Sequence, residues 1–403
     1  MSNIERAERP LRVTFAMTHP VQYYSPWFRF INESCPEIEL TVIYATVPTA
    51  GQQGVGFGVS FEWDTAPLDG YDFETLRPSR SGDYLHSDRF FGLDVPEIGR
   101  AIRESRPDAV VVPGWYSSTL VRALVSCRTH GIPTIYRGDT PLRIPNGLSS
   151  IPWTMRTRAM LRLFRSFLTV GTRNREYLEH FRIPDRRIHF SPHCVDNEFF
   201  ARCAEPVRTA VGRAGVRARL GIPAEDFAIL FVGKIDVNKR ASDIISAAAR
   251  LGEGVTAVIV GKGPEDDRCR TEATRLGVQA VFPGFVNQSG LGEIYAAADV
   301  CVLPSATETW GLVVNESLAT GTPCVVSDGV GCAPDLIRSG VTGDIFPVAD
   351  IPALTAALGR IRDEKSRGHD FAGDCRRVVS RYSFDVATDG LVEAARSLAR
   401  RIQ

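Results

Sequence analysis

Short apolar and β-branched runs alternate with helix-sized amphipathic segments through the first half of the chain. Each run is continuous, which is typical of parallel strands buried on both faces in βαβ units. The runs are "LRVTFAM" (11–17), "ELTVIYAT" (39–46), "DAVVVPG" (108–114), "PTIYRG" (133–138) and "FLTVG" (167–171). This pattern predicts a doubly wound α/β domain over residues 1–200.

The same pattern starts again after residue 226. The later runs are "FAILFVGK" (227–234), "VTAVIVGKG" (255–263), "AVFPGF" (280–285), "DVCVLPS" (299–305) and "PCVVSD" (323–328). We therefore expect a second Rossmann-like domain over residues 201–384, facing the first across a cleft. Residues 194–226 lack strand character and form the predicted linker. Residues 385–403 are helical by pattern and are expected to cross back to the first domain.

Composition narrows the class of protein. The 403 residues suit two domains, and 47 basic side chains against 47 acidic ones argue against nucleic acid as the main partner. The nine cysteines form no C-x-x-C pair, and no histidine cluster has metal-ligand spacing, so reduced thiols and no metal are expected. No signal peptide and no membrane-length apolar run is recognisable. These features predict a cytoplasmic protein of unknown oligomeric state.

Two loops of the predicted second domain carry candidate chemistry. In "GKIDVNKR", Lys234 and Lys239 follow a strand that ends in glycine, and two such cations suit a diphosphate. The alternative is a solvated basic loop.

In "ETWGLVVNE", a helix is expected to begin near Leu312, so that the main-chain N–H groups of Gly311 and Leu312 face the cleft. Glu308 and Glu316 then contact different parts of one extended ligand instead of sharing a proton. The alternative for Glu316 is favourable placement near the positive end of the helix.

The ordered set "FVGK", "VIVGKGP", "FPGFV" and "LPSATETWGLVVNESLATGTPCVVSDGVGCAPDLI" resembles the C-terminal domain of retaining glycosyltransferases of family 4, which have the GT-B fold. The first half agrees, because "HPVQYYSPWFR" (19–29), "GVGFGVSFEWDTAPLDGYDFETL" (54–76) and "SPHCVDNEFF" (191–200) resemble the group that has an N-terminal His-Pro-x-Gln-Tyr loop. The resemblance spans nearly the whole chain.

The resemblance implies roles for residues that match the family motif. Glu316 would hold the ribose, Glu308 the donor sugar, and Lys234 with Lys239 the diphosphate. Main-chain groups of Gly311 and Leu312 would contact the phosphate, and those of Phe285 and Val286 the base. Thr309 and Trp310 complete the expected donor site. The implied reaction is sugar transfer with retention and without a metal or cofactor, from a UDP-sugar in preference to a GDP-sugar, with Glu308, Lys239 and Asp139 as catalytic residues.

The first domain departs from the family pattern at two places. His19, Pro20, Val21 and Gln22 occupy the position of a glycine pair, and Asp139 stands where a histidine is expected. Asp139 would orient an acceptor and Arg137 would hold an acidic one, with an Asp-Arg turn pair as the equal alternative. The expected acceptor-side residues are His19, Gln22, Trp115, Arg137 and Asp139. A lone histidine such as His19 is more often structural, and we expect His193, near the hinge, to be structural first.

Two further segments permit more than one interpretation. "MRTRAMLRLFRSFLTV" (155–170) is basic and amphipathic, so its residues 155–168 suit anionic lipid, but packing of its apolar side in the first domain is the favoured interpretation. "GQQGVGFGVSFEWD" (51–64) is a weak dinucleotide fingerprint and is instead expected to be a long acceptor-side loop that closes over substrate.

A transferase is thus the leading hypothesis. The alternatives are a non-catalytic nucleotide-sugar-binding subunit, or an enzyme that uses the same cleft for phosphorolysis or cyclitol transfer. A nicotinamide dehydrogenase is disfavoured because no G-x-G-x-x-G motif follows a strand.

Overall fold

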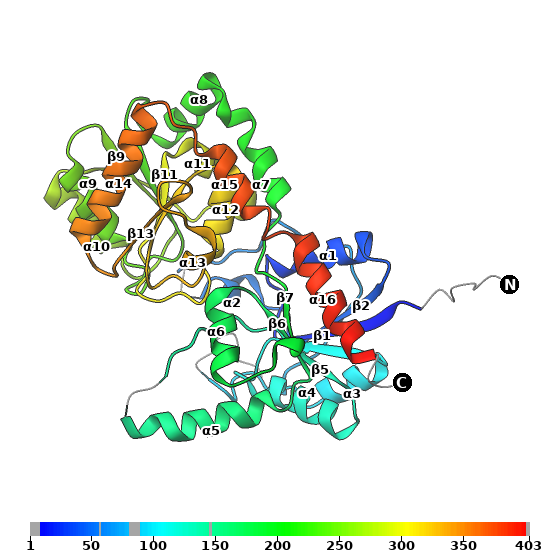
Figure 1. Cartoon of the computed structure of the whole chain (residues 1–403). Helices are drawn as coiled ribbons and strands as arrows, with labels where there is room; N and C mark the ends of the chain where they lie inside the picture. Colours follow the sequence, from blue (N-terminus) through cyan, green and yellow to red (C-terminus); the bar gives the residue numbers. More distant parts are fainter. Residues whose placement is uncertain (1–8, 56–57, 80–88, 145–146, 400–403) are drawn as a thin grey trace.

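The computed structural model describes residues 9–55, 58–79, 89–144 and 147–399, which form two α/β domains, each around one parallel sheet (Figure 1). The first sheet has the order β3-β2-β1-β4-β5-β6-β7, and every strand pair in it is parallel. Its strands are β1 (Leu11–Met17), β2 (Ile38–Tyr44), β3 (Phe73–Thr75), β4 (Ala109–Val112), β5 (Thr134–Tyr136), β6 (Ser166–Thr169) and β7 (Ile188–Phe190). Its helices are α1 (Tyr24–Ser34), α2 (Ala50–Gln53), α3 (Ile98–Glu104), α4 (Ser118–Thr129), α5 (Ser150–Leu161) and α6 (Thr172–His180).

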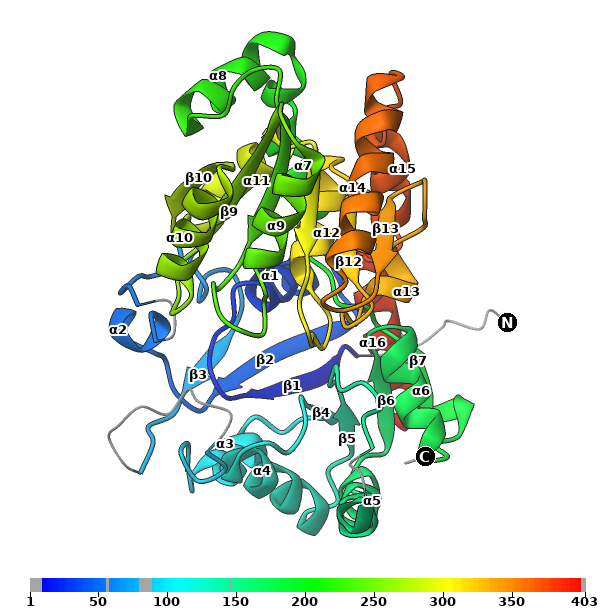
Figure 2. The same cartoon turned by 90° about the vertical axis from the view of Figure 1, so that its left-hand side faces the viewer.

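The second sheet has the order β10-β9-β8-β11-β12-β13 and is also parallel (Figure 2). Its strands are β8 (Phe227–Val232), β9 (Val255–Val260), β10 (Gln279–Gly284), β11 (Val300–Leu303), β12 (Cys324–Ser327) and β13 (Gly343–Phe346). Its helices are α9 (Ser242–Leu251), α10 (Asp266–Leu276), α11 (Gln288–Ala297), α12 (Leu312–Thr320), α13 (Ala333–Leu336), α14 (Ile351–Ser366) and α15 (Ala372–Val379). The expected pair of Rossmann-like domains is confirmed.

Each sheet reverses its strand order once, between β1 and β4 in the first domain and between β8 and β11 in the second. Loops that leave such a switch point on the carboxyl side of the strands diverge, and the crevice between them is where open α/β sheets bind ligands. The loops after β8 and β11 carry the motifs around Lys239 and Glu308. Fold topology therefore places these motifs at one crevice.

The last described helix, α16 (Phe384–Ala399), belongs to the first domain in space and lies beside α1 (Figure 1). Its Ala387 and Leu391 are buried in the same apolar core as Trp27, and the indole N–H of Trp27 donates to the Thr388 hydroxyl at 3.0 Å. Gly390 permits the close packing, since a Cβ there would lie 2.0 Å from the Phe190 carbonyl oxygen. Residues 400–403 of the predicted helix lie outside the described part of the chain.

Residues 194–226, the predicted linker, contain two helices that pack on the second domain. Helix α7 (Asn197–Ala204) contacts α11 and α12, and α8 (Ala210–Leu220) contacts α11. Phe200 of α7 is fully buried in the second-domain core. The segment is therefore largely helical and is not an extended connection.

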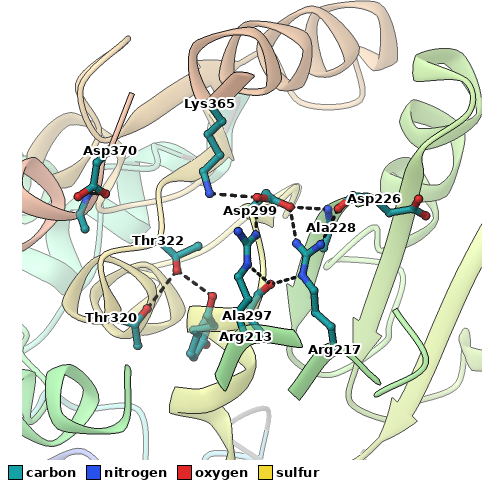
Figure 3. A network of polar contacts seen from close by, with 12 residues as sticks. Arg213, Arg217, Asp226, Ala228, Ala297, Asp299, Thr320, Thr322, Lys365 and Asp370 are labelled. Carbon is teal, nitrogen blue, oxygen red and sulfur yellow. Dashed lines mark hydrogen bonds and ion pairs between the residues drawn. The ribbon is translucent and has the colours of Figure 1, made fainter. Parts of the chain in front are cut away.

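An ion cluster fixes α8 to the base of the second sheet (Figure 3). The buried carboxylate of Asp299 accepts from Arg213 and Arg217 of α8 at 2.6 Å each, from Lys365 of α14 at 3.1 Å, and from the Ala228 N–H at 2.8 Å. Burial alone would raise the pKa of Asp299, but the charges of Lys365, Arg213 and Arg217 lower it to about 2. The cluster lies at the amino end of β11, on the edge of the sheet away from the crevice.

All nine cysteines are unpaired, and all but Cys203 are buried. Burial raises the pKa of thiols such as Cys127 and Cys194 to about 12, so they behave as small apolar core residues.

Candidate active site

A cavity of about 290 Å³ lies between the carboxyl edges of the two sheets. The first domain contributes Gln22, Tyr23, Trp63, Asp139 and His193 to its wall. The second contributes Val232, Gly233, Lys239, Val260, Gly261, Phe285, Val286, Leu291, Leu303, Glu308, Thr309, Trp310, Gly311, Leu312, Val313 and Glu316. The structure thus gathers in one place nine of the ten predicted donor-site residues, all except Lys234, together with Gln22 and Asp139 of the predicted acceptor side.

Lys239 and Glu308 form an ion pair in the cavity wall. The Lys239 N–H donates to Asp236 Oδ1 at 2.9 Å, which fixes the loop after β8. Glu308 Oε2 also accepts from the Ser305 hydroxyl at 3.3 Å, and the Glu308 N–H donates to the Gly329 carbonyl at 3.1 Å. A cation and a carboxylate are therefore held at the crevice, and either can be released to a ligand that competes for its partner.

Helix α12 begins at the cavity. Gly311 is its N-cap residue with φ of +106°, a conformation that favours glycine, and a Cβ there would approach Leu303 Cδ2 to 2.9 Å. No side chain among the described residues caps this end. The helix N-terminus and its partial positive charge thus face a cavity that Lys239 also lines, an arrangement that suits a phosphate group.

Glu316 lies in the second turn of α12 and is buried. The Tyr295 hydroxyl donates to its Oε2 at 2.7 Å. Burial raises the pKa of Glu316 to about 7, which the Tyr295 hydrogen bond opposes only in part. This carboxyl group therefore changes charge near neutral pH, and it has acceptor capacity left for a ligand hydroxyl.

Two glycines let main chain form part of the cavity wall. Gly233 (φ +153°) follows β8 and Gly261 (φ +134°) follows β9. A Cβ on Gly261 would lie 1.8 Å from the Gly233 carbonyl oxygen, so no side chain fits there. Sequence reasoning did not single out these positions, but the "VGK" repeated at the ends of the two strands is a signal that could have found them.

Asp139 and Thr309 join the two domains at the cavity. The Thr309 hydroxyl donates to Asp139 Oδ2 at 2.7 Å, and His193 Nε2 lies 3.7 Å from the same oxygen. Burial works to raise the pKa of Asp139, but the hydrogen bond and charge interaction with His193, with the Thr309 hydrogen bond, lower it below its ordinary value. Burial lowers the pKa of His193, and Asp139 opposes this shift. At neutral pH Asp139 is therefore an anionic acceptor in the wall.

Trp310 is buried where the two domains meet. Its indole N–H donates to Asn315 Oδ1 at 2.8 Å, and Asn315 in turn donates to the His193 carbonyl at 3.3 Å. Gly171 of the first domain allows the contact, because a Cβ there would lie 2.3 Å from the Trp310 ring. His193, expected to be structural first, has both features: its main chain holds this interface, and its ring lines the cavity.

Two predicted acceptor-side residues do not line the cavity. Arg137 is buried behind its wall, where the guanidinium donates to the Ser191 and Pro192 carbonyls at 2.6 and 3.1 Å and stacks 4.3 Å from the Trp27 ring centre. These contacts occupy the group that was expected to hold an acidic acceptor. Trp115 packs against Tyr136 and Phe164 of the first-domain core.

His19 and Lys234 also lie outside the lining residues. Thr18 Oγ1 is 3.1 Å from His19 Nδ1, and burial lowers the pKa of His19 to about 4, so the ring is neutral at neutral pH. Lys234 follows Gly233, which lines the cavity, but its ammonium is 3.9 Å from Asp236 and its side chain is 37% exposed. This ammonium is held only by a long ion pair and lies close to the wall, so an anion can compete for it.

Residues 61–64 of the first domain reach across to the second and form a strap over one end of the cavity. Phe61 packs on Phe285 at 4.3 Å, and the Asn287 amide donates to the Glu62 carbonyl at 2.7 Å. Asp64 accepts from the Ser289 N–H at 3.3 Å at the start of α11, and also from the Ser289 hydroxyl. Trp63, which sequence reasoning did not single out, lines the cavity. Residues 56–57 of the predicted closing loop are outside the described chain.

Among the described residues, no group of three or more His, Cys, Asp or Glu side chains is placed to hold a metal ion. The polar groups of the cavity include a lysine, carboxylates and main-chain N–H groups, which suit a polyhydroxylated ligand that carries phosphate.

Comparison with known proteins relates the second domain to a described family. Residues 213–374, most of the second domain, match the family described as Glycosyl transferases group 1. The D-inositol 3-phosphate glycosyltransferase of Thermomonospora curvata is 35% identical over 196 residues, 45% of either chain. The enzyme of that name from Streptomyces bingchenggensis is 37% identical over 215 residues, 49% of this chain and 47% of that protein. The match spans about half the length of these relatives.

Solved structures resemble the whole chain. The HepE protein of Anabaena, in complex with UDP and glucose, superposes with a TM-score of 0.71 at 15% identity over 96% of this chain and all of that one. Sucrose-phosphate synthase from Thermosynechococcus elongatus gives 0.71 at 17% identity over 97% of this chain and all of that one. At such identities the likeness shows the fold alone, and the chain has the GT-B fold that its sequence predicted.

Proposed function

We propose that this protein is a retaining, metal-independent glycosyltransferase that moves a sugar from a nucleotide-diphospho-sugar to an acceptor hydroxyl or other nucleophile. One observation carries the proposal: Glu308, Lys239, Glu316 and the N-terminus of α12 line a single cavity with Phe285 and Val286. The cavity thereby offers hydroxyl acceptors at two points with cationic and N–H groups beside them.

The donor would lie with its base along Phe285 and Val286 and its ribose on Glu316. Its diphosphate would lie at the α12 N-terminus and Lys239, and its sugar at Glu308. The diphosphate would compete for Lys239, which releases Glu308 to accept from sugar hydroxyls. Preorganised cations and N–H groups meet the charge that develops on the departing phosphate, so no further protein nucleophile is needed. Asp139 would orient the acceptor on the other side of the cavity.

UDP is the preferred nucleotide, and the HepE structure with UDP and glucose supports a UDP-sugar by analogy of fold. The relatives named D-inositol 3-phosphate glycosyltransferases make an inositol phosphate one acceptor to test. The expected location remains cytoplasmic.

Hydrolysis of UDP-, GDP- and ADP-sugars, with and without D-inositol 3-phosphate as acceptor, tests the proposal. Release of sugar from one donor is expected, with retained anomeric configuration by NMR and no loss on treatment with a chelator. Inverted product would refute retention, and nucleotide binding without turnover of any donor would support the binding-subunit alternative. Replacement of Glu308 by alanine separates these two, because a transferase then loses turnover far more than nucleotide affinity.

A further inference from the structure

Positive charge is concentrated in one segment of a chain whose net charge is zero. Between residues 140 and 175 there is no aspartate or glutamate. The same stretch contains Arg143, Arg156, Arg158, Arg162, Arg165, Arg173 and Arg175. Helix α5 lies in the middle of this stretch.

Helix α5 runs along the outer edge of the first domain (Figure 1). The end of α5 and the residues after it pack in the first domain, as the sequence analysis favoured, because Leu161, Phe164 and Phe167 are buried in the domain core. The first half of α5 leaves apolar side chains in contact with solvent, since Ile151 is 61% exposed and Met155 is 68% exposed.

Arg156, Arg158 and Arg162 are exposed on the same helix and its end. Ile151, Met155, Arg158 and Arg162 lie on one side of the helix and Arg156 lies at its flank, and we term these five residues the α5 face.

The arginines of the α5 face have no ion-pair partner among the described residues. Exposed arginines elsewhere are often paired, as Arg175 is with Glu179 and Asp185 at 2.8 and 2.7 Å. Uncompensated cations attract anionic surfaces over roughly a Debye length, about 8 Å at physiological salt. Apolar side chains beside them gain free energy only where water is excluded.

We propose that the α5 face docks the protein peripherally on an anionic lipid bilayer. The arginines would contact lipid phosphates while Ile151 and Met155 enter the boundary between headgroups and acyl chains. Ile144, six residues before α5, is also 48% exposed. A hydrophilic polyanion would use the arginines but would gain nothing from these apolar side chains, so the lipid surface is the better fit. Within the described chain, no helix is long and apolar enough to span a bilayer.

Only residues 140–149 separate Asp139, in the cavity wall, from the start of α5. Docking through α5 would place the first domain, which contributes Asp139 to the cavity, on the membrane. The docking itself does not depend on the proposed transferase activity.

Co-sedimentation of the full chain with vesicles tests the proposal. We expect binding to phosphatidylcholine vesicles that contain about one-third phosphatidylglycerol, weakening with salt, and none to phosphatidylcholine alone. The triple variant Arg156→Gln/Arg158→Gln/Arg162→Gln should lose at least about tenfold in affinity. Ile151→Ser/Met155→Ser should also weaken binding. Arg250→Gln/Arg338→Gln/Arg381→Gln, which changes exposed arginines of the second domain without a described ion pair, should bind as the unmodified chain does.

Circular dichroism would verify that each variant keeps its fold. Absence of binding to anionic vesicles, or binding that the α5 variants leave unchanged, would overturn the proposal. Retention of heparin, with loss on the arginine triple variant but no vesicle binding, would assign the face to a soluble polyanion. Full binding by Ile151→Ser/Met155→Ser would refute the insertion of apolar side chains.

Discussion

The Thr309 hydroxyl of the second domain donates a 2.7 Å hydrogen bond to the Asp139 carboxylate of the first. This bond joins the two domains within the cavity wall, so the position of Asp139 depends on how the domains meet. The same carboxylate faces His193, whose pKa is lowered by burial. Domain arrangement and the charge of this part of the cavity wall are thus coupled through one residue.

Replacement of Asp139 by asparagine keeps the side-chain shape but removes its charge. In the proposed reaction, donor hydrolysis should fall by roughly 10²-fold in kcat, because misplacement of the attacking group by about 1 Å costs about that factor. Donor affinity by calorimetry should stay the same. Thr309→Val is the matched control: it removes one hydrogen bond and should lower kcat by about tenfold at most. An Asp139→Asn loss that appears only in donor affinity would contradict the acceptor-side role.

Lys239→Met should weaken nucleoside diphosphate binding by roughly ten- to a hundredfold, since it removes a charged hydrogen bond to phosphate. Lys262→Met is the control, because Lys262 forms a similar pair with Asp266 at 2.6 Å but does not line the cavity. Calorimetry with UDP and GDP measures both. Equal losses of nucleotide affinity in the two variants would mean that the overall positive potential of the domain, rather than contact with Lys239, holds the nucleotide.

Much of the fold could be predicted because buried parallel strands leave a local signal. Ten strands coincide with continuous apolar runs, and α12 begins at Leu312 as expected. Three strands were not predicted: β3 has all three residues exposed, β7 has one buried residue, and β13 includes the ion-paired Asp344. Edge strands of three or four residues bury too little apolar surface to stand out from loops.

The second-domain half of the site was predictable since its residues lie on loops that follow the strands of one sheet and match the motif of a known family. The first-domain half was not. Arg137 was expected at the acceptor, but its guanidinium stacks on Trp27 and caps the Ser191 and Pro192 carbonyls, partners far away in sequence. Trp63 enters the wall only because Phe61 and Asp64 bind the second domain. Long-range contacts of this kind leave no local pattern.

Nucleotide affinity should depend on the charge of Glu316, whose pKa burial raises to about 7. The ribose hydroxyls would donate to the ionised carboxylate, so affinity should rise as pH increases through 7 and level off above it. Below 7, each pH unit should cost up to about tenfold. Glu316→Gln should lose the part of this pH dependence that comes from Glu316. It should keep the part that comes from titration of the diphosphate itself. Calorimetry with UDP from about pH 5.5 to about 8.5 compares them; parallel profiles would show that Glu316 does not contact the nucleotide.

The strap over the cavity should favour donor binding. Asp64→Ala removes the carboxylate that accepts from Ser289 at the start of α11 and should raise the donor KM by a few-fold up to about tenfold, as loss of a helix-capping side chain does. Asp69→Ala is the control, because Asp69 is exposed nearby and its carboxylate has no described contact with the second domain. Steady-state hydrolysis of the preferred donor gives both values. A lower KM for Asp64→Ala would instead mean that the strap obstructs entry of the donor.

Asp299→Asn should destabilise the chain by about 3–5 kcal/mol, because three cations then remain partly buried around a neutral amide. The carboxylate has a lowered pKa of about 2, so its contribution is complete above the ordinary aspartate value, near pH 4, and is lost as pH falls through 2. Urea denaturation should therefore show a large difference between the two chains at pH 7 that narrows below about pH 3. Glu272→Gln, which breaks an exposed pair with Arg275, should leave stability unchanged. A difference for Asp299→Asn that stayed constant with pH would mean that packing, and not charge, fixes α8 to the sheet.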